Sequence, residues 1–233
     1  MEFTITQQII MGLIQGISEW LPISSSAMLT LFMTNILGIT DMNQLLQSAL
    51  FLHLGTFFAA LIYFHKDIIK LTKSFFNWKK SNSQDKAIIK FLIITTLISG
   101  IFGIIILKLL SSINLTGKVI TFTIAILLLF TGFIQIKIKN KGLKKETNLK
   151  NKDSILLGFS QGLATLPGVS RSGITVSTLL LRKFDDTTSL KLSFLMSLPI
   201  VFLGNILLNL SDLQFITSTA IYGLLASFIF GLL

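Results

Sequence analysis

Two stretches of the chain follow one pattern: GLIQGISEWLPISSS at residues 12–26 and GFSQGLATLPGVSRS at residues 158–172. Each contains Gly-x-x-Gln-Gly, then a proline, then a serine-rich turn. Each also breaks a longer apolar segment, residues 4–38 and residues 154–182, near its middle. The remaining halves of roughly 13–16 residues are short for a helix that must span a bilayer with about 20 residues. We therefore predict two re-entrant helical hairpins that turn at the proline and serine residues.

The composition excludes a globule that is solvated on all sides. The 233 residues are 52% hydrophobic and only 13% charged, whereas soluble domains carry about 25% charged residues. With a mean hydropathy of +0.78, the chain falls in the membrane class. The absence of cysteine excludes disulfides, thiolate zinc sites and cysteine nucleophiles. In a membrane protein, the net charge of +10 indicates basic cytoplasmic loops rather than a nucleic-acid partner.

Further apolar segments are long enough to cross a bilayer without a break. We predict five transmembrane helices, at residues 44–65, 87–110, 117–136, 189–210 and 215–233. Residues 67–80 combine lysines with Phe and Trp, which predicts a short amphipathic helix in the membrane interface. The predicted fold is therefore an all-α membrane protein of one domain, residues 1–233, in the cell membrane.

Lysines set the predicted orientation. Loops 66–90 and 137–153 hold 14 of the 20 basic residues, and two predicted spans separate them, so both lie on one side. The positive-inside rule makes that side cytoplasmic. The first hairpin then enters from outside and the second from inside. Repeat one (1–137) and repeat two (154–233), joined by the basic loop 138–153, thus form an inverted-topology repeat whose broken helices meet near the midplane.

The two predicted hairpin tips carry the residues that are candidates for binding or catalysis. Glu19 and Arg171 are their ionisable residues, and a charge at the bilayer centre costs about 2.5–3.5 kcal/mol, so each needs a partner, water or a ligand. One interpretation is an ion pair that only locks the hairpins together. The other is an anion site, since serines begin each second half-helix and helix N-termini favour phosphate. The hydroxyl-bearing candidates for phosphate binding are Ser24, Ser25, Ser26, Ser170, Ser172 and Thr175.

Four stretches also resemble a known family, the undecaprenyl-diphosphatases of the bacitracin-resistance type. GLIQGISEWLPISSSAM is similar to its first signature and PGVSRSGIT to its second, while FLHLGTFFAALIYFHKD (51–67) and FSQGLATLP (159–167) add to the likeness. The resemblance runs from about residue 8 to residue 210, with both signatures in the right order. It implies an integral membrane phosphatase that removes the terminal phosphate of a C55-type polyprenyl diphosphate and leaves the monophosphate lipid carrier.

The resemblance also implies roles for individual residues. Glu19 is the expected essential carboxylate, and Gln15 stands in the companion position. Ser25 is the expected nucleophile or phosphate contact, and Arg171 is the expected phosphate clamp between Ser170 and Ser172. The family depends on a metal, so Mg²⁺ or Ca²⁺ is implied near Glu19 and Gln15, where carboxylate and amide oxygens suit a hard cation.

This sequence departs from the family pattern at two positions. Met28 stands where a histidine is usual, and its thioether cannot carry a proton. Gln15 replaces a second glutamate, which removes one charge that a metal would use. His53, on the span that follows the first hairpin, is the nearest chemical substitute. It is either a general acid or base or a hydrogen-bonded packing residue.

Three functions remain open on the sequence. The first is a phosphatase acting on a polyprenyl diphosphate in the bilayer. The second is a flippase for a polyprenyl phosphate, because inverted repeats with midplane sites are typical of transporters. The third is an inactive relative with a structural role. Family members usually carry a sixth span, and without it we expect an open flank that binds lipid or a second copy in a homodimer, with the C-terminus on the cytoplasmic side.

Overall fold

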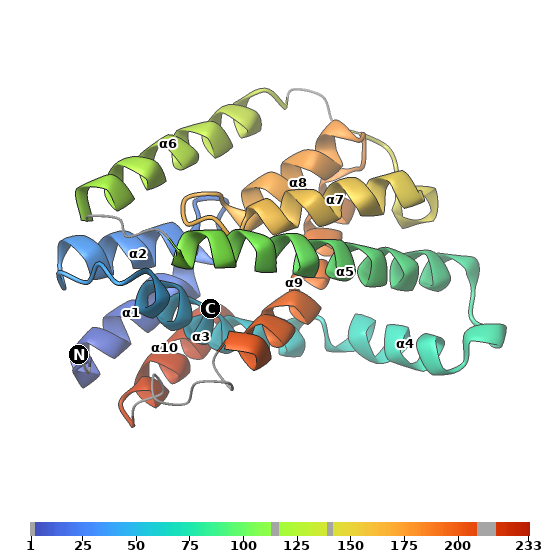
Figure 1. Ribbon diagram of the computed structural model, residues 1–233. Helices are drawn as coiled ribbons and strands as arrows, with labels where there is room; N and C mark the ends of the chain where they lie inside the picture. Colours follow the sequence, from blue (N-terminus) through green and yellow to red (C-terminus); the bar gives the residue numbers. More distant parts are fainter. Residues whose placement is uncertain (1–2, 113–116, 139–141, 209–217) are drawn as a thin grey trace.

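The computed structural model describes residues 3–112, 117–138, 142–208 and 218–233, and this part of the chain is helical (Figure 1). Its only β-type pairing is an isolated bridge between Lys144 and Phe184. The α-helices are α1 (Ile5–Ser18), α2 (Ser25–Asn35), α3 (Met42–Tyr63), α4 (His65–Phe76), α5 (Ser83–Ser111), α6 (Gly117–Ile136), α7 (Asn151–Leu163), α8 (Arg171–Leu181), α9 (Asp186–Leu208) and α10 (Ala220–Leu232).

Both broken segments fold as helical hairpins, α1 with α2 and α7 with α8. Ser24 caps α2 and Ser170 caps α8, each accepting a hydrogen bond from a backbone N–H of the first turn. The first helices have 14 and 13 residues, or about 20 Å each, less than the roughly 30 Å of a bilayer core. Their lengths suit re-entrant insertion, and the insertion itself, from opposite sides, stays a prediction from the lysine pattern.

The glycines of the Gly-x-x-Gln-Gly motif bring each hairpin against a helix from the other half of the chain. A Cβ on Gly12 would lie 2.2 Å from the Gly223 carbonyl oxygen, so α1 and α10 touch through their backbones. Gly158 and Gly162 of α7 face α5 in the same way, where a Cβ on Gly162 would lie 2.8 Å from Phe102. The motif therefore has a packing role in both repeats, and the two halves are interlocked.

Within the described residues, four helices are long and apolar enough to cross a membrane: α3, α5, α6 and α9. They confirm four of the five predicted spans, although 209–210 of the fourth lie outside the described residues. The fifth differs. Of the range 215–233, the structure describes residues from 218 on, and α10 has only 13 residues, about 20 Å. It pairs with the short helix α1 instead of running the full width of the bundle (Figure 1).

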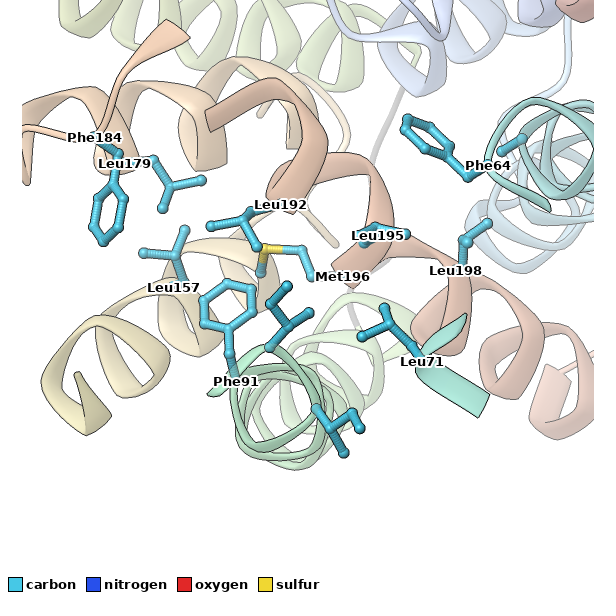
Figure 2. Close-up of a cluster of buried hydrophobic side chains, with 13 residues drawn as sticks. Phe64, Leu71, Phe91, Leu157, Leu179, Phe184, Leu192, Leu195, Met196 and Leu198 are labelled. Carbon is cyan, nitrogen blue, oxygen red and sulfur yellow. The ribbon is translucent and has the colours of Figure 1, made fainter. Parts of the chain in front are cut away.

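Apolar side chains form two buried clusters and also cover much of the outside. One cluster joins α3, α4, α5, α7, α8 and α9, and Figure 2 shows its well-packed end around Phe91, Leu157 and Leu192. The other joins α1, α2, α3 and α6. On the outside, Leu97 is 61% exposed and Leu129 is 74% exposed. Exposed apolar faces of this kind fit a surface that is surrounded by lipid.

Helix α4 is fixed to two neighbouring helices by charged side chains. Lys191 of α9 lies 2.6 Å from Asp67 at the start of α4. Lys70 lies 2.8 Å from Asp85 of α5, and Ser74 donates a hydrogen bond of 2.9 Å to the same carboxylate. A helix thus forms in the predicted region 67–80, but α4 spans His65–Phe76 and a separate 3-10 turn follows at Trp78–Lys80. Its place in the membrane interface stays a prediction.

Candidate active site

The tips of the two hairpins lie side by side near the middle of the molecule (Figure 1). Arg171, the first residue of α8, forms an ion pair with Glu19 at the end of α1. Ser172 donates a hydrogen bond of 3.3 Å to the Leu21 carbonyl oxygen of the other tip. Helix α6 lies over both tips, and its Gln135 donates to the Pro22 carbonyl oxygen at 3.0 Å. The structure therefore places the two predicted tips together.

Glu19 is the centre of the contacts between the tips. Its Oε1 accepts from the Arg171 guanidinium. Its Oε2 accepts from Gln15 Nε2 at 2.8 Å and from Ser25 Oγ at 2.6 Å. The carboxylate is only 7% exposed. A buried charge requires such partners, because an unpaired one would pay the full cost of desolvation.

His53 of α3 completes this group. Its Nε2 lies 3.2 Å from Glu19 Oε2 and 3.4 Å from Ser25 Oγ. Its Nδ1 lies 2.7 Å from the Ala49 carbonyl oxygen, which can only accept, so Nδ1 carries a hydrogen. Nε2 is then the nitrogen that faces Glu19 and Ser25. Met28, in contrast, is an exposed residue of α2.

The backbone turns sharply just before Ser25. Ser24 has φ 68°, in the left-handed region that non-glycine residues seldom adopt. Strain of this kind persists only where the surrounding structure enforces it, and it gathers at functional sites. The Ser24 hydroxyl caps α2 and lies 3.3 Å from the hydroxyl of Ser26, which is half-buried. This turn places Ser25 at the first position of α2, facing Glu19.

The serines of the second tip divide between the site and the helix packing. Ser170 accepts from Gly173 N as the cap of α8 and lies 3.4 Å from the Ser172 hydroxyl. Thr175 is fully buried; its hydroxyl donates to the Arg171 carbonyl oxygen and lies 2.7 Å from Ser193 Oγ on α9. Thr175 therefore joins α8 to α9.

A cavity of about 10 Å³ lies beside Glu19, His53 and Arg171, room for roughly one water molecule. None of the six hydroxyl-bearing candidates lines it. Several residues that are not among the predicted site residues also line it, namely Trp20, Thr56, Phe57, Ala60, Ser197, Leu198 and Val201. One signal was available for Thr56, which follows His53 by three positions and so lies on the same face of α3. Polar and apolar side chains both line the cavity: Arg171 and Glu19 come from the hairpin tips, and α3 and α9 contribute residues of both kinds.

The oxygen ligands at the hairpin tips suit a metal ion that is bound jointly with the substrate better than one that the protein holds alone. Among the described residues, no three His, Cys, Asp or Glu side chains gather as ligands. Glu19 is the single carboxylate at the tips, and both its oxygens already accept hydrogen bonds. Gln15 Oε1 is buried without a partner, which leaves one free oxygen beside it. Mg²⁺ commonly binds in this manner, through one or two protein oxygens, water and substrate phosphates.

An apolar helical bundle around a buried carboxylate, hydroxyl and guanidinium defines the class as a multi-pass membrane protein with a polar central site, and the comparisons identify the family. The model of the family described as Bacitracin resistance protein BacA matches residues 8–233. An undecaprenyl-diphosphatase of Methanococcoides burtonii is 37% identical over 98% of this chain and 87% of its own. One of Moorella thermoacetica is 36% identical over 99% and 86%. Undecaprenyl-diphosphatase 1 of Shouchella clausii is 34% identical over 97% and 82%. The chain belongs to the BacA family.

Proposed function

We propose that this protein hydrolyses undecaprenyl diphosphate, or a closely related polyprenyl diphosphate, to the monophosphate lipid and inorganic phosphate. The observation that carries the proposal is the buried group in which Ser25 donates to Glu19 while Glu19 pairs with Arg171. Relatives that align with nearly the whole chain are named undecaprenyl-diphosphatases. No comparison supports the flippase interpretation.

Each residue has a role that follows from its contacts. The guanidinium of Arg171 can bind a terminal phosphate through two parallel hydrogen bonds. Because the cavity is small, the phosphate has to take the place that Glu19 Oε1 now occupies on Arg171. Glu19 is then free to accept the proton of Ser25, whose Oγ attacks the terminal phosphorus. The bond from phosphorus to the bridging oxygen breaks, the lipid monophosphate leaves, and water releases phosphate from Ser25.

A divalent cation completes the proposal. Glu19 and Gln15 would hold Mg²⁺ or Ca²⁺ together with the diphosphate oxygens, and the cation would neutralise charge on the transferred phosphoryl group. The residues of the site supply too few oxygens to retain the metal without substrate. Metal binding by the free protein should therefore be weak, and it should tighten when a non-hydrolysable diphosphate is present, as measured by calorimetry in detergent.

The purified protein in detergent tests the function directly. We expect phosphate release from farnesyl or undecaprenyl diphosphate in the presence of Mg²⁺ or Ca²⁺, and its loss with a chelator. Binding of the lipid without any release of phosphate would contradict hydrolysis. It would instead favour a flippase or an inactive relative.

We expect His53 to take over the task of the histidine that Met28 replaces. His53→Gln should remove most of the activity and flatten the pH profile between about pH 5 and 8, where histidine titrates. Met28→His should restore activity to that variant, because position 28 lies one turn after Ser25 on α2. Rates of phosphate release across this pH range provide the measurement. Unchanged rates in both variants would show that Glu19 accepts the proton without a contribution from His53.

We propose that the protein lies in the cell membrane with loops 66–90 and 137–153 in the cytoplasm. The support is their lysine content. A single cysteine at Lys145, which is 72% exposed at its side chain, should react with a membrane-impermeant thiol reagent in inverted vesicles and not in intact cells. Labelling in intact cells would invert the orientation. A homodimer also stays a prediction, which light scattering of the purified protein tests.

A further inference from the structure

A second, larger cavity adjoins the candidate active site. Its volume is about 500 Å³, and it lies between α3, α4, α5 and α9. Phe57 and Leu198 line both this cavity and the small one at Glu19 and Arg171. The two spaces therefore meet at this pair of side chains, with the polar site on one side and the larger cavity on the other.

The chemistry of the larger cavity is that of a hydrocarbon site. Of the described residues that line it, all but Thr72 and Thr96 are apolar. Its volume is in the range of about 300–1,000 Å³ that holds small ligands in proteins. Phe57 stacks on Phe202 of α9, with ring centroids 5.9 Å apart. Figure 2 shows Leu71, Leu195 and Leu198 at this end of the cluster, away from the well-packed end around Phe91.

The cavity is a built feature of the fold. Helix α4 supplies one wall, and the ion pairs of Asp67 with Lys191 and of Lys70 with Asp85 fix that wall to α9 and α5. The opposite edge opens outward between α5 and α9, where Leu97 is 61% exposed and Phe202 is 49% exposed. A chain inside the cavity can therefore continue into surrounding lipid without a tight bend.

We propose that this cavity binds the first isoprene units of the polyprenyl diphosphate substrate, with Phe57 and Leu198 as the neck through which the chain leaves the phosphate site. The inference rests on the proposed function and adds to it where the lipid chain lies. Continuity with the Glu19–Arg171 site selects this occupant over an unrelated lipid, because a diphosphate held by Arg171 places its first carbons at the neck. Burial of each further methylene then adds to the binding of the substrate.

Filling the cavity should discriminate between chain lengths. Thr96 lines it from α5, away from the neck. Thr96→Trp should lower kcat/KM for farnesyl diphosphate at least tenfold, about 1.4 kcal/mol, and leave dimethylallyl diphosphate within twofold. Ile101→Trp, on the lipid-facing side of the same helix and 64% exposed, is the matched control and should change neither substrate. Equal losses for both substrates, or none, would overturn the inference.

A binding measurement keeps this test independent of hydrolysis and of the folding of the variant. A farnesyl diphosphate that carries a diazirine on its terminal isoprene should label α4, α5 or α9 at the cavity, and excess undecaprenyl phosphate should displace it. Label on the outer face of α6, or displacement by phospholipid alone, would identify an ordinary membrane-lipid contact and refute the proposal. If wild-type protein is labelled at the cavity but releases no phosphate, the proposed hydrolysis fails while the chain site stands.

Discussion

Glu19→Gln is expected to lower kcat/KM for a polyprenyl diphosphate by about a hundredfold to ten-thousandfold, the contribution of a positioned acid or base. The same change should destabilise the protein by about 3–5 kcal/mol, because it leaves the Arg171 guanidinium paired with a neutral group inside the bundle. Phosphate release and thermal unfolding in detergent measure the two effects separately.

The double variant Glu19→Gln, Arg171→Gln separates a catalytic pair from a structural one. With both charges removed, much of the lost stability should return while activity stays absent. If activity recovers together with stability, the Glu19–Arg171 ion pair has only the structural role of holding the two hairpins together. Asp153→Asn is the matched control, since Asp153 is 1% exposed and pairs with Arg182 at 2.7 Å away from the site. It should lower stability and leave the turnover of the folded enzyme unchanged.

Ser25→Ala should reduce turnover by more than about ten-thousandfold, because removal of a catalytic nucleophile reaches that scale or beyond. A serine that only contacts the phosphate would cost far less. A hydrogen bond to a charged group contributes about 1.5–3 kcal/mol, or roughly 10- to 150-fold. The size of the loss in single-turnover phosphate release therefore decides between the two roles that the sequence left open for Ser25.

Ser18→Ala provides the comparison for this measurement. Ser18 precedes Glu19 and is 5% exposed, but its hydroxyl donates to the Ile14 carbonyl oxygen of its own helix. The variant should keep turnover within about twofold, since a helix interior tolerates alanine well. A loss as large as that of Ser25→Ala would show that any small change near Glu19 distorts the site, and the nucleophile assignment would then fail.

The hairpins and the meeting of their tips could be predicted because the sequence repeats its own signals. Proline and serine mark each break, and the lysine loops imply opposite insertion, so the sequence predicts that Glu19 and Arg171 lie close together. Four spans were equally clear from their lengths. Helix α10 was not, because apolar content alone does not reveal that a segment pairs with the short helix α1 through Gly12 and Gly223.

Details of the site depended on tertiary packing that periodicity does not encode. Thr175 has the same chemistry as its serine neighbours, yet its hydroxyl contacts Ser193 on a later helix and joins α8 to α9. Trp20 lies in the turn of the first hairpin, where its Nε1 donates to the Gly231 carbonyl oxygen of α10 and its ring meets Phe194 edge-on. Such contacts join residues from distant parts of the chain, so local sequence patterns do not predict them.

The contacts between the two halves of the chain also have a consequence for protein synthesis, because they can form only after both halves have been translated. Glu19 and Arg171 are 152 residues apart in sequence, and ribosomes add about 5–20 residues per second, so the carboxylate enters the membrane roughly 8–30 seconds before its partner is made. Through that interval the carboxylate lacks its guanidinium partner, and an unpaired charge in lipid is costly. Helix α1 also lacks its packing partner α10 until that helix, which lies later in the sequence, has been translated. A nascent chain that ends before Arg171 therefore holds every residue of the first hairpin but lacks the Glu19–Arg171 pair, so the proposed mechanism requires the second half of the chain before activity can begin.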